Sequence, residues 1–376
     1  MQAVRLGSNT AEISQLSNYK RPRPIPHQFS QSRHARKIRI RSDTGSGRKK
    51  RFIWLGGILI VLVTIGGIAR KLYPQSFPPG FSTTKNEIKD QHPQLGASGQ
   101  RQPFRQGKVK WQLLKTDNFD GQTLNDELWE YGWFRFQGKG KYDAPVNDSE
   151  TACYSTDQVT IRNGELNLSL RPTTEEENSK DVCKRKNGEP AYFVSGYVTT
   201  RSRLQIQPGT YIEARMFIPG ELNILYNWPA LWTTDMDKTL GGPWPYTGEF
   251  DILEVLKGEP CGDYHFATSI DGKHQQAGKK CSNIPANTWV IFAMKWNYDG
   301  TVEYFHAGEK IKDFFGQPWT IDTKQLAGKV SSNYSHNIAI QYGMHGDHRA
   351  GYKTPTISDP LILKVDYIDV YKLPKE

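Results

Sequence analysis

From Val109 onward, apolar and polar residues alternate along short runs that turn residues separate. A period of two residues is typical of β-strands, and helical periods are scarce here. The pattern predicts one all-β domain over residues 109–376, a sandwich or β-jelly roll whose curved sheet offers a concave substrate cleft. The expected strands are Val159–Ile161, Glu165–Leu170, Tyr197–Thr200, Tyr211–Ile218, Val290–Trp296, Val302–Phe305 and Ile338–Tyr342.

The run Trp244–Glu254 carries three acids among aliphatic and aromatic residues. Because successive side chains of a strand point to opposite faces, Glu249 and Asp251 share one face and strict alternation puts Glu254 on the other. A β-bulge near Ile252–Leu253 inserts one unpaired residue and returns Glu254 to the face of the first two acids. We therefore expect all three carboxylates on one surface.

Two glutamates at this spacing suit the hydrolysis of a glycosidic bond. In retaining glycosidases two carboxyl groups lie about 5–5.5 Å apart, so that one attacks the anomeric carbon while the other protonates the departing oxygen. With the bulge, the Cα atoms of Glu249 and Glu254 are roughly 13 Å apart, and side chains that lean inward can close most of that distance. Asp251 lies between them, where it can hydrogen-bond Glu249 and raise the pKa of Glu254. The alternative is that the three acids form only a solvated strand face.

The chain resembles glycoside hydrolase family 16, in particular its laminarinase-like members, which are endo-β-1,3-glucanases. The resemblance rests on a Glu-x-Asp-x-x-Glu signature preceded by Trp-Pro and Gly, and it covers about residues 110–372. It implies a β-jelly roll with a sugar-binding cleft, in which Glu249 is the nucleophile, Glu254 the general acid/base and Asp251 the residue that assists them. The matching segments are Trp244–Glu254, Gly209–Pro219, Asn227–Trp232 and Val365–Tyr371.

Three tryptophans, Trp228, Trp232 and Trp244, lie close to the acids in sequence. Aromatic faces stack on pyranose rings, and the resemblance implies that tryptophans in these segments line sugar subsites. Packing in the core is the competing use. His265 belongs to the strand expected next, where it can bind a sugar hydroxyl, polarise the site or serve as a hydrogen-bonded structural residue.

The proposed chemistry requires no cofactor, but the resemblance implies a candidate structural calcium ion. Many family members bind it with an acid near the start of the domain and the Asp of a closing Val-Asp-Tyr. Asp366 matches the second position, whereas the first reads Asn118. The early segment Ser149–Tyr154 is a second departure, because it lacks a Gln that family members often carry, and it leaves the distal sugar subsites undefined.

The four cysteines, Cys153, Cys183, Cys261 and Cys281, allow three disulfide pairings. We expect Cys153 with Cys183 and Cys261 with Cys281, because each pair closes a local loop, and a loop of such size is stabilised by about 3 kcal/mol. Structural disulfides fit an oxidising exterior. A free catalytic cysteine is the alternative, but no His stands beside one in a family-like motif.

Residues 1–51 carry thirteen Lys and Arg against two acids, so we expect a disordered basic arm. The rest of the chain has 36 basic and 37 acidic residues, and the arm therefore accounts for the net charge of +10. Nucleic-acid binding by the arm is the competing interpretation. Interleaved aromatics and a recognisable fold are lacking, so no nucleic-acid partner is expected.

Residues 52–69 form an uncharged apolar run that spans about 27 Å as a helix, just enough to cross a bilayer. Cations flank this run on both sides, with Arg48–Arg51 before it, and the positive-inside rule favours a cytoplasmic arm. We expect a single-pass signal anchor, with a cleaved signal peptide as the alternative. Residues 70–108 follow as a linker rich in Pro, Gly, Gln and Ser, so the catalytic domain is extracellular or periplasmic.

These features predict a membrane-anchored, monomeric, retaining endo-β-glycosidase that hydrolyses β-1,3- or mixed-linkage glucan. A transglycosylase that remodels cell-wall glucan shares the same residues and differs in whether sugar or water resolves the glycosyl-enzyme. A catalytically silent polysaccharide-binding jelly roll is the alternative from another class, and the pair of glutamates argues against it. A third alternative is a structural membrane protein whose arm engages nucleic acid or anionic lipid headgroups.

Overall fold

The structure is a computed structural model. It describes residues 94–95, 101–103, 111–132, 142–147, 149–180, 183–185, 188–220, 227–236, 243–256, 259–313, 315–331, 335–345 and 359–375. All of them belong to one compact unit, Thr83–Glu376. The expected basic arm, the expected membrane anchor and most of the expected linker lie outside the described residues. None of the helices within these ranges has the length and apolar character needed to span a bilayer.

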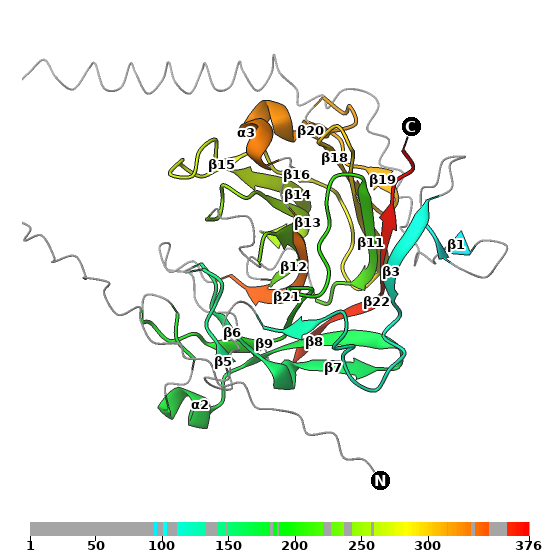
Figure 1. Cartoon of the computed structure of the whole chain (residues 1–376). Helices are drawn as coiled ribbons and strands as arrows, with labels where there is room; N and C mark the ends of the chain where they lie inside the picture. Colours follow the sequence, from blue (N-terminus) through cyan, green and yellow to red (C-terminus); the bar gives the residue numbers. More distant parts are fainter. Residues whose placement is uncertain are drawn as a thin grey trace, which may run out of the picture. The chain divides into compact units, whose positions relative to one another are not determined.

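Two β-sheets packed against each other dominate the described chain, and we call them the front sheet and the back sheet (Figure 1). The front sheet has eight strands in the order β15 (Gln275–Gln276), β14 (Glu259–Phe266), β13 (Glu249–Leu256), β12 (Asn227–Thr234), β21 (Asn337–Met344), β10 (Tyr197–Thr199) and β4 (Glu130–Tyr131), with β16 (Lys280–Cys281) also paired to β14.

The back sheet has twelve strands, and its main path is β19 (Glu309–Lys310), β18 (Thr301–His306), β17 (Trp289–Trp296), β11 (Thr210–Phe217), β22 (Leu361–Lys372), β8 (Glu165–Pro172), β9 (Phe193–Ser195), β6 (Ala152–Ser155) and β5 (Tyr142–Asp143). Beside this path, β20 (Thr320–Asp322) pairs with β18, β3 (Gln112–Asp117) with β22, and β7 (Val159–Arg162) with β8. The β6–β9 pair is parallel.

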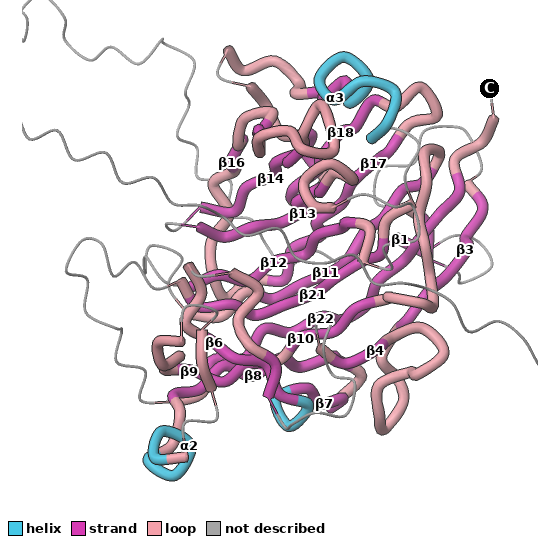
Figure 2. The backbone as a smooth tube through the Cα atoms, turned by 60° about the vertical axis from the view of Figure 1, so that its left-hand side comes forward, coloured by secondary structure: helices cyan, strands magenta, loops and turns pink. Residues whose placement is uncertain are grey.

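The remaining elements are short, and Figure 2 shows how far strands outweigh helices. They are the β1–β2 pair (Gln94–Leu95 with Arg101–Gln102), the 3₁₀ turn η1 (Thr156–Gln158), α2 (Glu175–Ser179) and α3 (Thr323–Ser331). Each strand expected from the sequence is present, and its ends differ from the expected ones by at most two residues. The all-β sandwich is thus confirmed.

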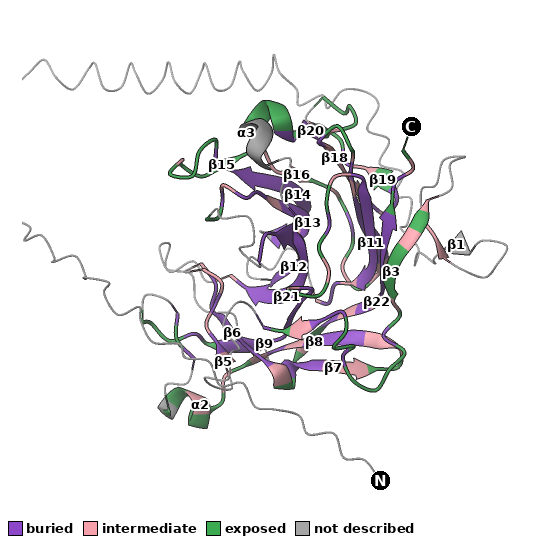
Figure 3. Cartoon of the chain, in the orientation of Figure 1, coloured by how far each residue is buried: buried purple, intermediate pink, exposed green. Residues whose placement is uncertain are grey.

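The hydrophobic core lies between the two sheets, as the buried colouring of β11–β14 in Figure 3 shows. Alternation along β11 sends Ile212, Ala214 and Met216 into this core, and all three are fully buried. The intervening residues of β11 face outward, because neighbouring side chains of a strand point to opposite faces. The sandwich therefore has two outward faces, one on each sheet, on which polar side chains can gather.

Part of the expected linker packs on the back sheet. Arg101 of β2 contacts the fully buried Asp369 of β22, with Nε 2.8 Å and Nη2 2.9 Å from the two carboxylate oxygens. Its guanidinium carbon lies 4.1 Å from the centroid of the Tyr367 ring. The Tyr371 hydroxyl donates to the Arg101 carbonyl at 3.3 Å. The folded unit thus begins before residue 109, where alternation becomes visible in the sequence.

The disulfide pairing is as expected. Cys153 bonds Cys183, and Cys261 bonds Cys281. Cys261 and Cys281 are direct cross-strand partners on β14 and β16, so the second bridge fastens the edge of the front sheet next to β13.

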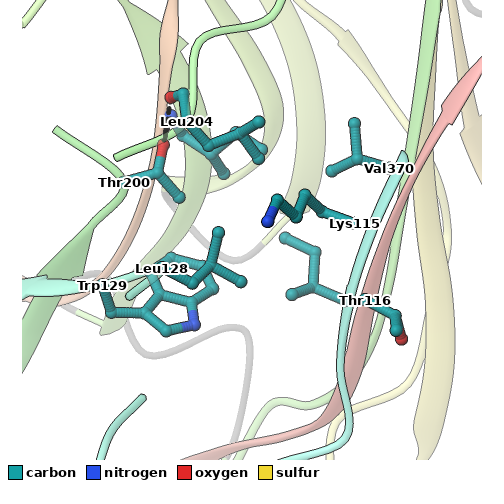
Figure 4. A pocket seen from close by; sticks show the side chains of 9 residues that line it. Lys115, Thr116, Leu128, Trp129, Thr200, Leu204 and Val370 are labelled. Atoms are coloured by element: carbon teal, nitrogen blue, oxygen red, sulfur yellow. Dashed lines mark hydrogen bonds between the residues drawn. The ribbon is translucent and has the colours of Figure 1, made fainter. Parts of the chain in front are cut away.

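A narrow pocket, with no room for a water molecule, lies between the two sheets (Figure 4). The Lys115 side chain extends into it, and apolar side chains form much of the remaining wall. None of the predicted site residues lines it. The lining residues are Lys115, Thr116, Leu128, Trp129, Thr200, Leu204, Ile338, Ile368 and Val370.

Candidate active site

The bulge expected in β13 is present. Toward β14, Asp251 pairs with Asp263 and Glu254 with Cys261, so β13 carries one residue more than its partner between these pairs. Ile252 and Leu253 are consequently both fully buried in the core. The side chains of three acids of β13 lie instead on the outward face of the front sheet, and we call these residues the acid row: Glu249, Asp251 and Glu254.

A buried histidine of the back sheet satisfies the backbone at the bulge. His306 of β18 approaches the Ile252 carbonyl with Nε2 at 2.8 Å, and its Nδ1 lies 2.7 Å from the Ser282 hydroxyl. Burial lowers the pKa of His306 to about 4, so the ring is neutral near pH 7. Since a carbonyl only accepts, Nε2 carries the proton and the serine hydroxyl donates to Nδ1. The bulge carbonyl, which a regular ladder would have paired, is thereby hydrogen-bonded.

The turn that leads into Glu249 is fixed in a similar way. Gly248 has a φ of +82°, a conformation that side chains with a Cβ rarely adopt. Its carbonyl accepts from the Thr234 hydroxyl at 2.7 Å, and the Thr247 carbonyl accepts from His336 Nε2 at 3.0 Å. Two backbone carbonyls are thus held, one from β12 and one from the residue just before β21, which sets the direction in which β13 begins.

A tryptophan and a histidine contact the first two acids of the row. Trp244 Nε1 donates to Glu249 Oε2 at 2.8 Å. His265 Nε2 lies 3.0 Å from Asp251 Oδ2, 3.8 Å from Asp263 Oδ2 and 4.0 Å from Glu249 Oε1. We expected Asp251 to hydrogen-bond Glu249 directly, whereas here the His265 ring lies next to both carboxylates.

The two glutamates of the row both hold their protons more tightly than free glutamate. Burial raises the pKa of Glu249 to about 8, with a further contribution from the Asp251 charge. Burial and then the Asp251 charge also raise the pKa of Glu254, while Lys279 acts in the opposite direction. Because the two carboxylates repel each other, they titrate as a unit, and a proton on one favours ionisation of the other.

His265 is the cation at the centre of the cluster. Burial lowers its pKa, but contact with Asp251 and the charges of Glu249 and Asp263 outweigh burial and raise it to about 10. The Nδ1–H of the imidazolium donates to His274 Nε2 at 2.6 Å. Burial and the His265 charge lower the pKa of His274, which keeps it a neutral acceptor. Ligand atoms of Glu249, Asp251 and His265 lie close enough together to hold a metal ion. The protonated His265 ring already supplies a positive charge to the two carboxylates.

The three candidate tryptophans differ in exposure. Trp244 is 50% exposed, whereas Trp228 and Trp232 are 9% and 5% exposed. Trp228 Nε1 donates to Glu254 Oε1 at 3.1 Å, and Trp232 Nε1 donates to Gln341 Oε1 at 3.2 Å. Trp244 therefore presents an open ring to a ligand. Trp228 and Trp232 lie on the outward face of the front sheet, where their indole N–H groups orient the side chains of Glu254 and Gln341.

The two residues considered for calcium both contact arginines. Asp366 Oδ2 lies 2.8 Å from Arg215 Nη1, and the Asn118 side-chain oxygen accepts from Arg101. A guanidinium beside a carboxylate already neutralises it, so these residues as arranged do not fit a cation site. Calcium remains a prediction, and the contacts of its candidate ligands do not support it.

Several side chains of the cluster were not singled out as candidates from the sequence. Asp263 had a signal, since it alternates with His265 on the same strand and must share its face. The other three come from segments that sequence spacing does not connect to the acid row. Pairing of β15 and β16 with β14 brings His274 and Lys279 beside the acids, and packing of the back sheet brings His306 to the bulge. These residues are Asp263, His274, Lys279 and His306.

Comparison with known proteins identifies the fold. No protein-family model matches the chain. It is 20% identical over 247 residues to the keratan-sulfate endo-1,4-β-galactosidase of Sphingobacterium multivorum, a match that covers 64% of this chain and 54% of that protein. The chain thus spans about half the length of this curated relative.

Solved structures share this fold over about 70% of the chain. The laminarinase catalytic domain from Thermotoga maritima superimposes with a TM-score of 0.54 and 22% identity, covering 71% of this chain and 100% of that one. A non-specific endo-β-1,3(4)-glucanase of glycoside hydrolase family 16 gives a TM-score of 0.53 and 18% identity, with 70% and 95% covered. The sandwich therefore has the fold of glycoside hydrolase family 16, as the resemblance in the sequence implied.

Proposed function

We propose that this protein is a retaining endo-β-glycosidase that acts by double displacement. The observation that carries the proposal is the β13 bulge, which brings Glu249 and Glu254 to one face with Asp251 between them. A binding module needs no such pair of partly buried glutamates with raised pKa values. In the proposed reaction Glu249 is the nucleophile and Glu254 the general acid/base.

The contacts of each acid suit its proposed role. Attack by Glu249 on the anomeric carbon requires its carboxylate form. Burial and the Asp251 charge oppose that form, whereas the Trp244 N–H and the nearby His265 imidazolium stabilise it. Departure of the aglycone requires a proton on Glu254, whose pKa burial and Asp251 raise. Water then gives a proton to Glu254 as its oxygen bonds the anomeric carbon and the bond to Glu249 breaks.

For the substrate we propose a β-1,3- or mixed-linkage glucan, bound along a cleft on the front sheet. The laminarinase and β-1,3(4)-glucanase structures support this choice, since their fold is shared over most of the sandwich. The exposed Trp244 ring next to Glu249 offers a stacking surface for a pyranose. A β-galactan is the second candidate, and the similarity to a keratan-sulfate endo-1,4-β-galactosidase favours it.

We also propose that the enzyme works outside the membrane that residues 52–69 would cross. The two disulfide bonds support an oxidising compartment. Protease treatment of intact cells or spheroplasts tests this location. Digestion of the sandwich in intact samples supports it, whereas protection until the membrane is broken contradicts it.

The decisive test uses the full-length chain with β-1,3-glucan, mixed-linkage glucan, β-1,4-galactan and keratan sulfate. Proton NMR of the first products reports their anomeric configuration. We expect internal cleavage of one of these polymers with retention of the β-configuration. Products of inverted configuration would overturn the double-displacement proposal.

The same incubations separate the alternative activities. Oligosaccharides longer than the supplied donor indicate transglycosylation instead of hydrolysis. Binding without cleavage, equally strong in wild type and Glu249→Gln, indicates a silent polysaccharide-binding module. Cleavage lost in Glu249→Gln with binding retained supports the enzyme.

A further inference from the structure

Lys279 contacts the proposed acid/base directly. Its Nζ lies 2.5 Å from Glu254 Oε2, and the side chains are 27% and 15% exposed. The other carboxylate oxygen of Glu254 accepts from Trp228 Nε1 at 3.1 Å. Both oxygens of Glu254 are thus held by donors, one neutral and one charged.

A covalent bridge fixes the segment that carries Lys279. Glu254 on β13 pairs with Cys261 on β14, and Cys261 pairs with Cys281 on β16. These three residues form one row across three strands, and the disulfide joins the last two. Lys279 stands two residues before Cys281. The bridge therefore limits how far the ammonium group can move from Glu254.

The other charged groups around Glu254 are mostly negative. Glu249 and Asp251 face it from β13, and Asp263 faces it from β14. His265 of β14 is cationic, but it contacts Asp251 at 3.0 Å. Toward β12 and β21, Glu254 meets the Trp228 indole, whose ring packs 5.3 Å from that of His345. Among the described residues, Lys279 is the cation in direct contact with Glu254.

We propose that Lys279, held in place by the Cys261–Cys281 bridge, is a positioning residue that orients the Glu254 carboxylate and sets the pH above which Glu254 stops acting as an acid. This role rests on the proposed glycosidase mechanism. When Glu254 has given its proton to the departing oxygen, the ammonium group stabilises the resulting carboxylate until water returns a proton to it.

Removing the ammonium group has a defined effect. Burial and the Asp251 charge raise the pKa of Glu254, and Lys279 opposes them. In Lys279→Met the opposition is lost, so the pKa rises further. A neighbouring cation shifts a carboxyl group by about 1–3 pH units, and we expect the alkaline limb of the kcat/KM profile to move up by about one unit or more. Below the new pKa, kcat falls, because less Glu254 is ionised to accept the proton of water.

Two further variants of the full-length chain separate this role from a structural one. Lys279→Arg keeps the charge and is expected to restore the alkaline limb to within a few tenths of a pH unit of wild type. Lys280→Met is the matched control, because Lys280 Nζ lies 6.0 Å from the centroid of the Trp319 ring, away from the acid row. An equal shift in Lys280→Met, or an unchanged profile in Lys279→Met, would overturn the proposal.

A second measurement does not depend on activity. Carbon-13 NMR of chains labelled at glutamate side-chain carboxyls, assigned with Glu254→Gln, titrates Glu254 directly in wild type and in Lys279→Met. An upward shift supports the role of Lys279 even if every tested polymer is left intact, in which case the glycosidase proposal fails alone. The double variant Cys261→Ser/Cys281→Ser is expected to shift the titration in the same direction by a smaller amount. If it titrates as wild type, the bridge does not position Lys279.

Discussion

Buried carboxylates lie on both outward faces of the sandwich, but the protein neutralises them differently. On the back sheet, Glu213 accepts from the hydroxyls of Tyr211 and Tyr367 at 3.0 and 3.1 Å. Asp369 accepts from Arg101 and from the Tyr371 hydroxyl at 3.0 Å. We call Glu213 and Asp369 the back acids. On the front sheet, Glu249, Asp251, Glu254 and Asp263 crowd around the cations of His265 and Lys279.

The two sheets differ in whether the groups that donate to the carboxylates can lose their protons. Burial and then the neighbouring carboxylates raise the pKa of the tyrosines of the back sheet, so these phenols remain protonated donors throughout the stable pH range. Arginine likewise keeps its charge. The front sheet relies instead on a histidine and on protons shared between acids, all of which can be exchanged. The back arrangement suits stability, and the front one suits proton transfer at some cost in stability.

The largest expected effect is the loss of glycoside cleavage in Glu249→Gln, by about a thousandfold or more, because the amide cannot act as the nucleophile. Glu213→Gln is the matched control on the back sheet. It should leave kcat per folded molecule unchanged and lower the free energy of unfolding by about 1–2 kcal/mol through a weakened hydrogen-bond pair. Kinetics and urea denaturation of both variants measure this. Loss of cleavage in Glu213→Gln would contradict the assignment of the back acids to stability alone.

The second effect concerns the cation of the back acids. Arg101→Met leaves Asp369, which is fully buried, without its charged partner. Breaking a buried pair in this way costs about 3 kcal/mol or more, and we expect that decrease in the free energy of unfolding. An unchanged denaturation midpoint would contradict the role assigned to Arg101.

The third effect links the two sheets. His306→Phe removes the donor to the Ile252 carbonyl and leaves a buried acceptor without a partner, at a cost of about 1–3 kcal/mol. Because that carbonyl belongs to the bulge that turns Glu254 outward, kcat should also fall by about tenfold or more, as expected when a reacting group is displaced slightly. His306→Gln can still donate and should recover part of both losses. Lost stability with unchanged kcat would show that the bulge persists without His306.

The smallest effect is a pH dependence of stability. The pKa of Glu249 is raised to about 8 from the 4.5 of free glutamate, so the folded state binds the proton more tightly than the unfolded state does. Its contribution to stability is therefore present below about pH 4.5 and is lost as the pH rises to about 8. Urea midpoints of wild type minus those of Glu249→Gln should decline across this window. A rising difference would contradict the raised pKa.

Sequence reasoning predicted the strands, the bulge and both disulfides because each leaves a local signal. Alternation in β11 and β17 reports which side chains face the core. Three acids at 249, 251 and 254 share a face only if one residue of β13 is unpaired, so the hypothesis that they act together predicts the bulge. The cysteines pair with their neighbours in sequence, and short loops close easily.

Other parts of the structure depend on contacts between distant segments. Arg101 meets Asp369 across 268 residues, and His306 meets Ile252 across 54. No periodicity or spacing within one segment indicates such a contact. Lys279 was missed for a related reason, because a lysine near a cysteine has no distinct pattern until the order of β13, β14 and β16 is known. The exposure of Trp244 relative to Trp228 and Trp232 was likewise undetermined from sequence.

The position of Arg101 has a practical consequence for handling the enzyme. Arg101 packs on the back sheet, whereas the acid row lies on the outward face of the front sheet. A shortened chain that begins at residue 109, where alternation becomes visible, would keep every residue of the acid row but lose the guanidinium that contacts the fully buried Asp369. Such a chain would be expected to retain the reactive groups and to unfold more easily.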